Sequence, residues 1–172
     1  KEFALRLSDQ LKEGEVHIPQ LIEKFKTIAM ASVATSAYEA FDFGYLLSDR
    51  DQVCIHGNNA IYQAKLKVLQ LAENYIMASP RKDIMVLGRS GLAALYTGAN
   101  SLKRGNYASE HDIKIAKKIA YVLCGGDLSS PQKVSEQYLL DIEREPFLSL
   151  CSEPKTLERI QFMLEHNKPL RN

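Results

Sequence analysis

The 172-residue sequence has no tryptophan, only three cysteines and no long apolar run. Its longest apolar runs are far shorter than the roughly 20 residues that a membrane helix needs, so we expect no membrane span. The formal net charge of +1 gives no charge excess that would favour nucleic acid or a membrane surface as a partner. With 45% hydrophobic and 25% charged residues, the composition is that of a globular chain rather than a disordered one.

The three cysteines, Cys54, Cys124 and Cys151, are widely spaced and form no CxxC pair. An odd number at such spacing favours reduced thiols over a disulfide framework, and so a cytoplasmic location. Cys124 and Cys151 lie at the ends of apolar helical patterns, where we expect them to be buried and structural.

Both ends of the chain are unusual for a complete small protein. It begins Lys1-Glu2-Phe3, with neither Met nor a signal-peptide pattern, and it ends on the basic stretch Lys168–Asn172. We therefore expect a piece of a longer protein. The tail from His166 onward is expected to be exposed or docked on a partner.

Helical patterns separated by short turns predict a mainly α fold, a bundle-like single domain over residues 1–172 with at most short extended pieces. The expected helices are about Glu2–Glu13, from Pro19, from Ser36 to Gly44, about Asn58–Met77, Gly91–Arg104, from Ser109 to Leu123, from Ser135 through Phe147, and from Pro154. Val53–Ile55 is the best strand-like run, and Ile84–Leu87 is either extended or the lead-in to a helix. Pro146 predicts a kink or a break in its helix.

Several of these helices carry apolar positions at helical spacing that are expected to face a core, among them the helix from about Asn58 to Met77 and the helix from Ser109 to Leu123. The positions are Ile61, Ala64, Val68, Leu71, Ala72 and Tyr75 in the first helix, and Ile113, Ala116, Ile119, Ala120 and Leu123 in the second. Ser36 with Glu39, and Ser109 with acidic residues after it, predict helix starts.

No complete active site can be assembled from the residues. The sequence has no GxGxxG, Walker or HExxH motif, and we therefore predict no catalytic residue and no metal ligand. The adjacent His111 and Asp112 point in different directions on a helix, which favours structural roles. The backbone N–H groups of the glycines around Arg89 could bind a phosphate together with the Arg89 guanidinium. Alternatively, the same glycines could simply begin a helix, without a ligand. Lys114, Lys117 and Lys118 share a helix face that could dock a phosphate-bearing ligand or could simply be solvated.

Four segments together resemble known enzymes. Thr35–Leu46 is similar to the S-A-x-E-A-x-x-x-G-L/F segment of the enoyl-CoA hydratase/isomerase (crotonase) family. Gly105–Gly126, and Glu136–Glu145 with Lys168–Asn172, are similar to the C-terminal region of bacterial two-part 3-hydroxyacyl-CoA dehydrogenases. In that family a nicotinamide-binding dehydrogenase half precedes a crotonase-like half. The similarity runs from about residue 20 to the end.

The resemblance implies a role in fatty-acid β-oxidation, with NAD and acyl-CoA bound by the whole protein. The GxGxxG loop, the catalytic His and the oxyanion-hole segment of the family have no counterpart here, so no catalytic or cofactor residue can be carried over. The chain would then be a helical C-terminal piece that packs against the rest of its own polypeptide, forms a homo-oligomer or covers the acyl-CoA site. It would be inactive alone.

A second hypothesis belongs to a different class. A stand-alone helical interaction or scaffold module would show the same helix starts and apolar faces without any catalytic site. Whether the chain belongs to an enzyme therefore stays open from the residues alone.

Overall fold

The computed structural model describes residues 1–10 and 17–172, and these form a mainly α chain as the sequence predicts. They divide into two compact units. Unit 1 comprises Lys1–Ser32 and Pro80–Asn172, and unit 2 comprises Val33–Ser79. The predicted end of the first helix at Glu13 lies outside the described residues. The prediction of a single domain over 1–172 stays a prediction.

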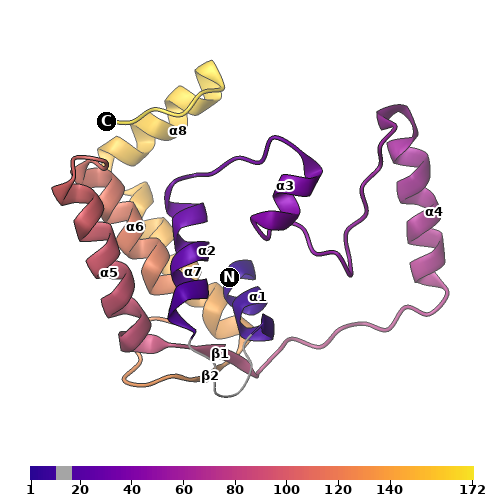
Figure 1. Cartoon of the computed structure of the whole chain (residues 1–172), viewed down its shortest axis with the longest axis horizontal. Coiled ribbons are helices and arrows are strands. Elements are labelled where there is room, and N and C mark those ends of the chain that lie inside the picture. The colour runs from indigo at the N-terminus through magenta and orange to yellow at the C-terminus, as the bar shows by residue number, and fades with distance from the viewer. Residues whose placement is uncertain (11–16) are drawn as a thin grey trace. The chain divides into compact units, whose positions relative to one another are not determined.

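Unit 1 holds most of the secondary structure (Figure 1). Its elements are α1 (Glu2–Gln10), α2 (Ile18–Ala29), β1 (Ile84–Val86), α5 (Gly88–Arg104), α6 (Glu110–Leu123), β2 (Gln132–Val134), α7 (Glu136–Cys151) and α8 (Pro154–His166). The helix starts follow local chemistry. The Ser109 hydroxyl accepts the Asp112 N–H at the start of α6, and Ser135 accepts the Tyr138 N–H at the start of α7.

The main core of unit 1 lies where α5, α6 and α2 pack together. It is formed by Leu21 and Phe25 of α2, Leu92, Leu95 and Ala99 of α5, and Ile113, Ala116, Ala120 and Leu123 of α6, with Cys124 and Leu7. The predicted apolar face of α6 is therefore buried, except that Ile119 is only half-buried. Helix α5 begins at Gly88, three residues before the predicted start.

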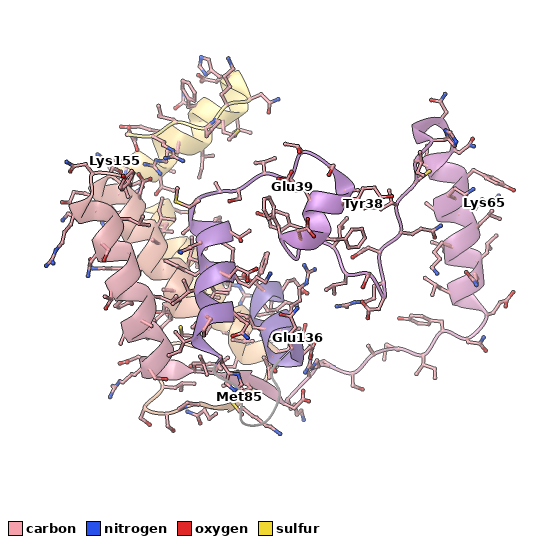
Figure 2. The ribbon with its side chains drawn as sticks, viewed as in Figure 1. Tyr38, Glu39, Lys65, Met85, Glu136 and Lys155 are labelled. Atoms are coloured by element: carbon pink, nitrogen blue, oxygen red, sulfur yellow. The ribbon has the colours of Figure 1, made fainter. Side chains whose placement is uncertain are left out.

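A smaller core joins α1, β1 and α7 through Ala4, Ile84, Val86, Leu139 and Ile142. Strand β1 pairs antiparallel with β2, with Ile84 opposite Val134. The Met85 N–H donates to the Ser8 hydroxyl of α1 over 2.9 Å, which ties the strand to the first helix. Figure 2 labels Met85 on β1.

The structure contradicts the predicted strand at Val53–Ile55 and one of the two alternatives predicted for Pro146. Val53–Ile55 is not a strand, because β1 pairs with β2 and no strand lies beside residues 53–55 within the described chain. Helix α7 does not break at Pro146 but continues to Cys151, so the predicted break is wrong, whereas the predicted kink stays a prediction. Pro146 removes one helical hydrogen bond, yet it is buried along the same helix as Leu139 and Ile142, and this packing holds the helix together.

Unit 2 contains α3 (Ala37–Asp42), the single 3₁₀ turn η1 (Gly57–Asn59) and α4 (Ala60–Ala72). Ser36 accepts the Glu39 N–H as predicted, and the Glu39 carboxylate reaches back to the N–H and hydroxyl of Thr35. Tyr38 and Glu39 are neighbours on this short helix (Figure 2). Helix α4 ends at Ala72 rather than near Met77, and its predicted inward face is not buried.

Candidate functional site

Arg89, the first candidate phosphate ligand, is engaged by a carboxylate. It lies in the first turn of α5, where its Nε and Nη2 donate to the two carboxylate oxygens of Asp127 over 2.7 and 3.0 Å. This two-pronged arrangement suits a guanidinium and a carboxylate. The hydrogen bond lowers the pKa of the Asp127 carboxyl and raises the pKa of Arg89. A phosphate at Arg89 would have to compete with Asp127.

The glycine turn before Arg89 uses its backbone N–H groups within the chain. The Gly88 N–H donates to the Cys124 carbonyl over 2.9 Å, and the Arg89 N–H donates to the Leu128 carbonyl over 2.8 Å. Gly88 has a φ of +55°, and a Cβ there would collide with the Leu128 carbonyl, which explains glycine at this position. The turn therefore joins α5 to the loop after α6 rather than presenting these donors to solvent.

The three lysines of α6 have different surroundings, and Lys114 lies away from Arg89. Lys114 Nζ pairs with Glu153 Oε1 at 2.6 Å, and Lys117 Nζ lies 5.8 Å from the centre of the Tyr96 ring. Lys118 adds to the positive field that lowers the pKa of Glu153, whose main cause is the hydrogen bond from Lys114. Gly88 contacts Cys124 at the far end of α6, so at about 1.5 Å per residue Lys114 lies about 15 Å from that end. The structure does not bring Arg89 and Lys114 to one site, and the phosphate role of all four residues stays a prediction.

A polar cluster joins the start of α6 to α8 and to the last residue. Arg159 of α8 donates to Asp112 Oδ1 over 2.8 Å and to the side-chain oxygen of Asn172 over 2.8 Å. The backbone oxygen of Asn172 accepts the Ser109 hydroxyl over 3.2 Å. The last residue thus docks on its own chain, which the predicted alternatives, an exposed tail or one docked on a partner, did not include, whereas Asn167–Pro169 and Arg171 are exposed as one of them expects. No sequence signal links Arg159 to Asp112, because the two are 47 positions apart.

His111 lies buried beside this cluster. It is 5% exposed, and its Nε2 lies 3.0 Å from the Thr156 hydroxyl of α8. Burial lowers its pKa, and the positive charge of Arg159 adds to this effect. For Asp112, burial raises the pKa, but hydrogen bonds from Ser109 and Arg159 outweigh it and leave the pKa below its ordinary value. The two neighbours face different partners, which agrees with structural roles rather than a catalytic pair.

A groove of about 520 Å³ runs along one side of α4 in unit 2. Its walls are residues 50–56 with Asn59, and the side of the helix that carries Ala60, Gln63, Ala64 and Lys67. The Cys54 thiol in this groove contacts the His56 carbonyl at 3.2 Å, and no base is placed against it by any described contact. Across residues 1–10 and 17–172, no group of three or more His, Cys, Asp or Glu side chains could hold a metal ion.

Unpartnered apolar surface is the most prominent feature of unit 2. No residue from 33 to 79 is buried. The large exposed apolar side chains on and after α4 are Ile61, Tyr62, Leu66, Val68, Leu69, Leu71, Tyr75, Ile76 and Met77. In unit 1, Leu157, Ile160 and Leu164 of α8 are exposed as well. Within the described part of the chain, no helix is both long and apolar enough to span a membrane.

The chain is similar to a bacterial enzyme. It is 42% identical over 164 residues to "Probable 3-hydroxyacyl-CoA dehydrogenase" of Bacillus subtilis (strain 168). The match covers 95% of this chain and 21% of that protein, so the chain spans about a fifth of the length of this relative. No protein-family model and no solved structure matches the chain. The relative agrees with the dehydrogenase part of the resemblance that the sequence indicates.

Proposed function

We propose that this chain is one section of a longer 3-hydroxyacyl-CoA dehydrogenase of the two-part kind. The whole protein would oxidise 3-hydroxyacyl-CoA with NAD in fatty-acid β-oxidation in the cytoplasm, and would carry a crotonase-like half. This section supplies packing surface, in the form of subunit contacts or a cover over the acyl-CoA site. The chemistry takes place on residues outside the section.

One observation carries the proposal: the 42% identity extends over 95% of the chain but over only 21% of the dehydrogenase it matches. A similarity that fills nearly the whole chain implies that the chain folds as the matching section does. The remaining four fifths of the relative have room for the nicotinamide site and the acyl-CoA site, whose sequence motifs we do not find in this chain.

The residues of this chain do not fit NAD. A dinucleotide needs a glycine-rich turn whose free N–H groups face the pyrophosphate at the start of a helix. The only comparable turn in the described residues has its Gly88 and Arg89 N–H groups bonded to backbone carbonyls, and Asp127 occupies the Arg89 guanidinium. We therefore derive no step of hydride transfer from this section, and assign NAD to the rest of the longer protein.

The test is an NAD reduction assay with a 3-hydroxyacyl-CoA substrate, run on the full-length gene product and on residues 1–172 expressed alone. The full-length protein should form NADH, and the 172-residue chain should not. Turnover by residues 1–172 alone would show that catalytic groups lie within them. Absence of turnover in the full-length protein, with several acyl-chain lengths, would refute the dehydrogenase assignment.

A stand-alone scaffold remains the second candidate, because the buried core of unit 1 is closed by helices from this chain alone. The reading frame around Lys1 separates the two candidates. An in-frame coding sequence for a dehydrogenase or crotonase-like stretch favours the first, whereas a start codon immediately before Lys1 and a stop codon after Asn172 favour the second.

A further inference from the structure

We propose that α8 and Asn172 form a pH-sensitive latch on the start of α6, which is released when His111 gains a proton. The latch is α8 together with Asn172, and it lies entirely within unit 1, as does α6. The proposal goes beyond the proposed function and does not rest on it.

Polar contacts hold the latch on α6. Arg159 of α8 donates to Asp112 Oδ1 over 2.8 Å, and the Thr156 hydroxyl lies 3.0 Å from His111 Nε2. No residue of α8 is buried, and none belongs to the main core that holds α6 against α5 and α2. Helix α8 lies at the end of α6 where that helix begins (Figure 1). Separating α8 from α6 therefore leaves the main core closed.

Asn172 is tied to α8 as well as to α6. Its side-chain nitrogen donates to Glu158 Oε2 over 2.6 Å and to the Lys155 carbonyl over 3.3 Å, and its side-chain oxygen accepts from Arg159 over 2.8 Å. On the α6 side, its backbone oxygen accepts the Ser109 hydroxyl over 3.2 Å. Because several of its bonds are made within the latch, Asn172 leaves α6 together with α8.

His111 lies buried at this junction, with its Nε2 facing α8. A buried imidazolium is costly unless a carboxylate or water offsets its charge. The nearby carboxylates are already hydrogen-bonded by cations, Asp112 by Arg159 and Glu153 by Lys114. Moving α8 away lets water reach the ring, and this movement is how the cost of the added proton is relieved.

The charges around the ring favour its neutral form in the closed latch. Burial is the main cause that lowers the pKa of His111, and the positive charge of Arg159 comes next; Glu153 opposes them. The charged groups at the junction are Glu110, Asp112 and Lys114 of α6, Lys103 of α5, Glu153 before α8, and Lys155, Glu158 and Arg159 of α8. Histidine is the side chain that ordinarily changes charge between pH 7.5 and 5.5.

His166 provides a matched control on the same helix. It ends α8, where its ring stacks on Phe162 and its Nδ1 lies 3.2 Å from the Phe162 carbonyl. A proton on His166 would stabilise α8, because a positive charge is favourable at a helix C-terminus. Its titration therefore acts in the opposite direction to the effect that we propose for His111.

The test is amide hydrogen exchange of the full-length gene product at pH 7.5 and 5.5, with each rate compared with that of the unfolded sequence at the same pH. Local opening exposes less surface than global unfolding, so its exchange responds little to low urea. Peptides of α8 should therefore exchange faster than peptides of α5 at both pH values, with little dependence on low urea. Protection of α8 should fall about three- to tenfold from pH 7.5 to 5.5, because the released latch takes up a proton that the closed latch excludes.

Two variants identify the responsible group. His111→Gln keeps a side chain that can bond to Thr156 but cannot gain a proton, so protection of α8 should be the same at both pH values. His166→Gln should keep the pH dependence of wild type. A pH dependence that persists in His111→Gln, or disappears in His166→Gln, would assign the effect to another group and overturn the proposal.

Wild type alone also decides the question if a variant does not fold. Equal protection of α8 at both pH values would overturn the latch. So would equal protection and equal urea dependence of α8 and α5, because His111 would then act only through global unfolding. None of these outcomes bears on NADH formation, which tests the proposed function separately.

Discussion

The approach of α5 to α6 and α2 can be tested with two glycines of the same helix. Gly91 and Gly98 lie about two turns apart on α5, and Ala at either position gains about 0.5–1 kcal/mol of helix stability over Gly. A Cβ at Gly98 would meet nothing within 4 Å. Gly98→Ala should therefore stabilise the chain by about 0.5–1 kcal/mol.

At Gly91 the same change meets the core. The new Cβ would lie 2.9 Å from Cys124 Sγ and 3.0 Å from both Leu21 Cδ2 and Leu87 Cβ. These atoms come from three directions and are packed in the core, so they cannot all move away cheaply. Overpacking of this kind costs about 1–3 kcal/mol. After the gain in helix stability, Gly91→Ala should destabilise the chain by up to about 2.5 kcal/mol.

The measurement is urea unfolding followed by far-ultraviolet circular dichroism, with wild type and both variants at one pH. The midpoint should rise for Gly98→Ala and fall for Gly91→Ala at equal slope. Adding Cys124→Ala to Gly91→Ala should recover part of the loss, because it removes the nearest atom. If Gly91→Ala proved as stable as Gly98→Ala, the three helices would not approach each other as closely as described.

Three further predictions concern the α6–α8 junction and the buried thiol. Because burial holds the pKa of His111 below 6.5, the unfolded chain takes up a proton there more readily than the folded one. The free energy of unfolding should therefore fall as pH drops below about 6.5, and His111→Gln should reduce that dependence in urea titrations at pH 7.5, 6.5 and 5.5. Arg159→Ala should lower the free energy of unfolding by about 1–3 kcal/mol, because it leaves the half-buried Asp112 without its cation, and it should expose the tail to carboxypeptidase. Arg159→Lys should lower the free energy of unfolding less. Equal rates of digestion for wild type and both variants would contradict the docked tail. Burial raises the pKa of Cys124 to about 12, so Ellman's reagent at pH 8 should modify Cys54 before Cys124, and equal rates would contradict the packing of that thiol.

Local chemistry predicts most of the helices of unit 1. Ser109 and Ser135 cap helices where the sequence places them, and the apolar spacing from Ile113 to Leu123 identifies the buried side of α6. The strands were harder to predict than the helices. Local propensity could not decide whether Val53–Ile55 or Ile84–Leu87 forms a strand, because the pairing of Ile84 with Val134 depends on a contact across 50 positions.

The candidate ligand residues show why charge patterns alone mislead. Arg89 and Lys114 each have the side chain that a phosphate would need, but each lies within 3 Å of a carboxylate oxygen from a distant part of the chain. Sequence spacing identifies neither Asp127 as the partner of Arg89 nor Glu153 as the partner of Lys114. The loop after α6 brings Asp127 close to Arg89, and the turn before α8 brings Glu153 close to Lys114. A free cation and a paired one look the same in a sequence.

Helix α4 shows what an apolar pattern does and does not determine. The spacing from Ile61 to Leu71 predicts a covered face, and the helix forms, but the face has no cover within unit 2. The periodicity of apolar residues predicts that a helix face is buried, but it does not identify the residues that cover the face. For α6 the cover is Leu95 and Ala99 of the neighbouring helix α5. For α4 the same kind of apolar spacing predicts a face that packs against other residues, but the spacing does not identify them.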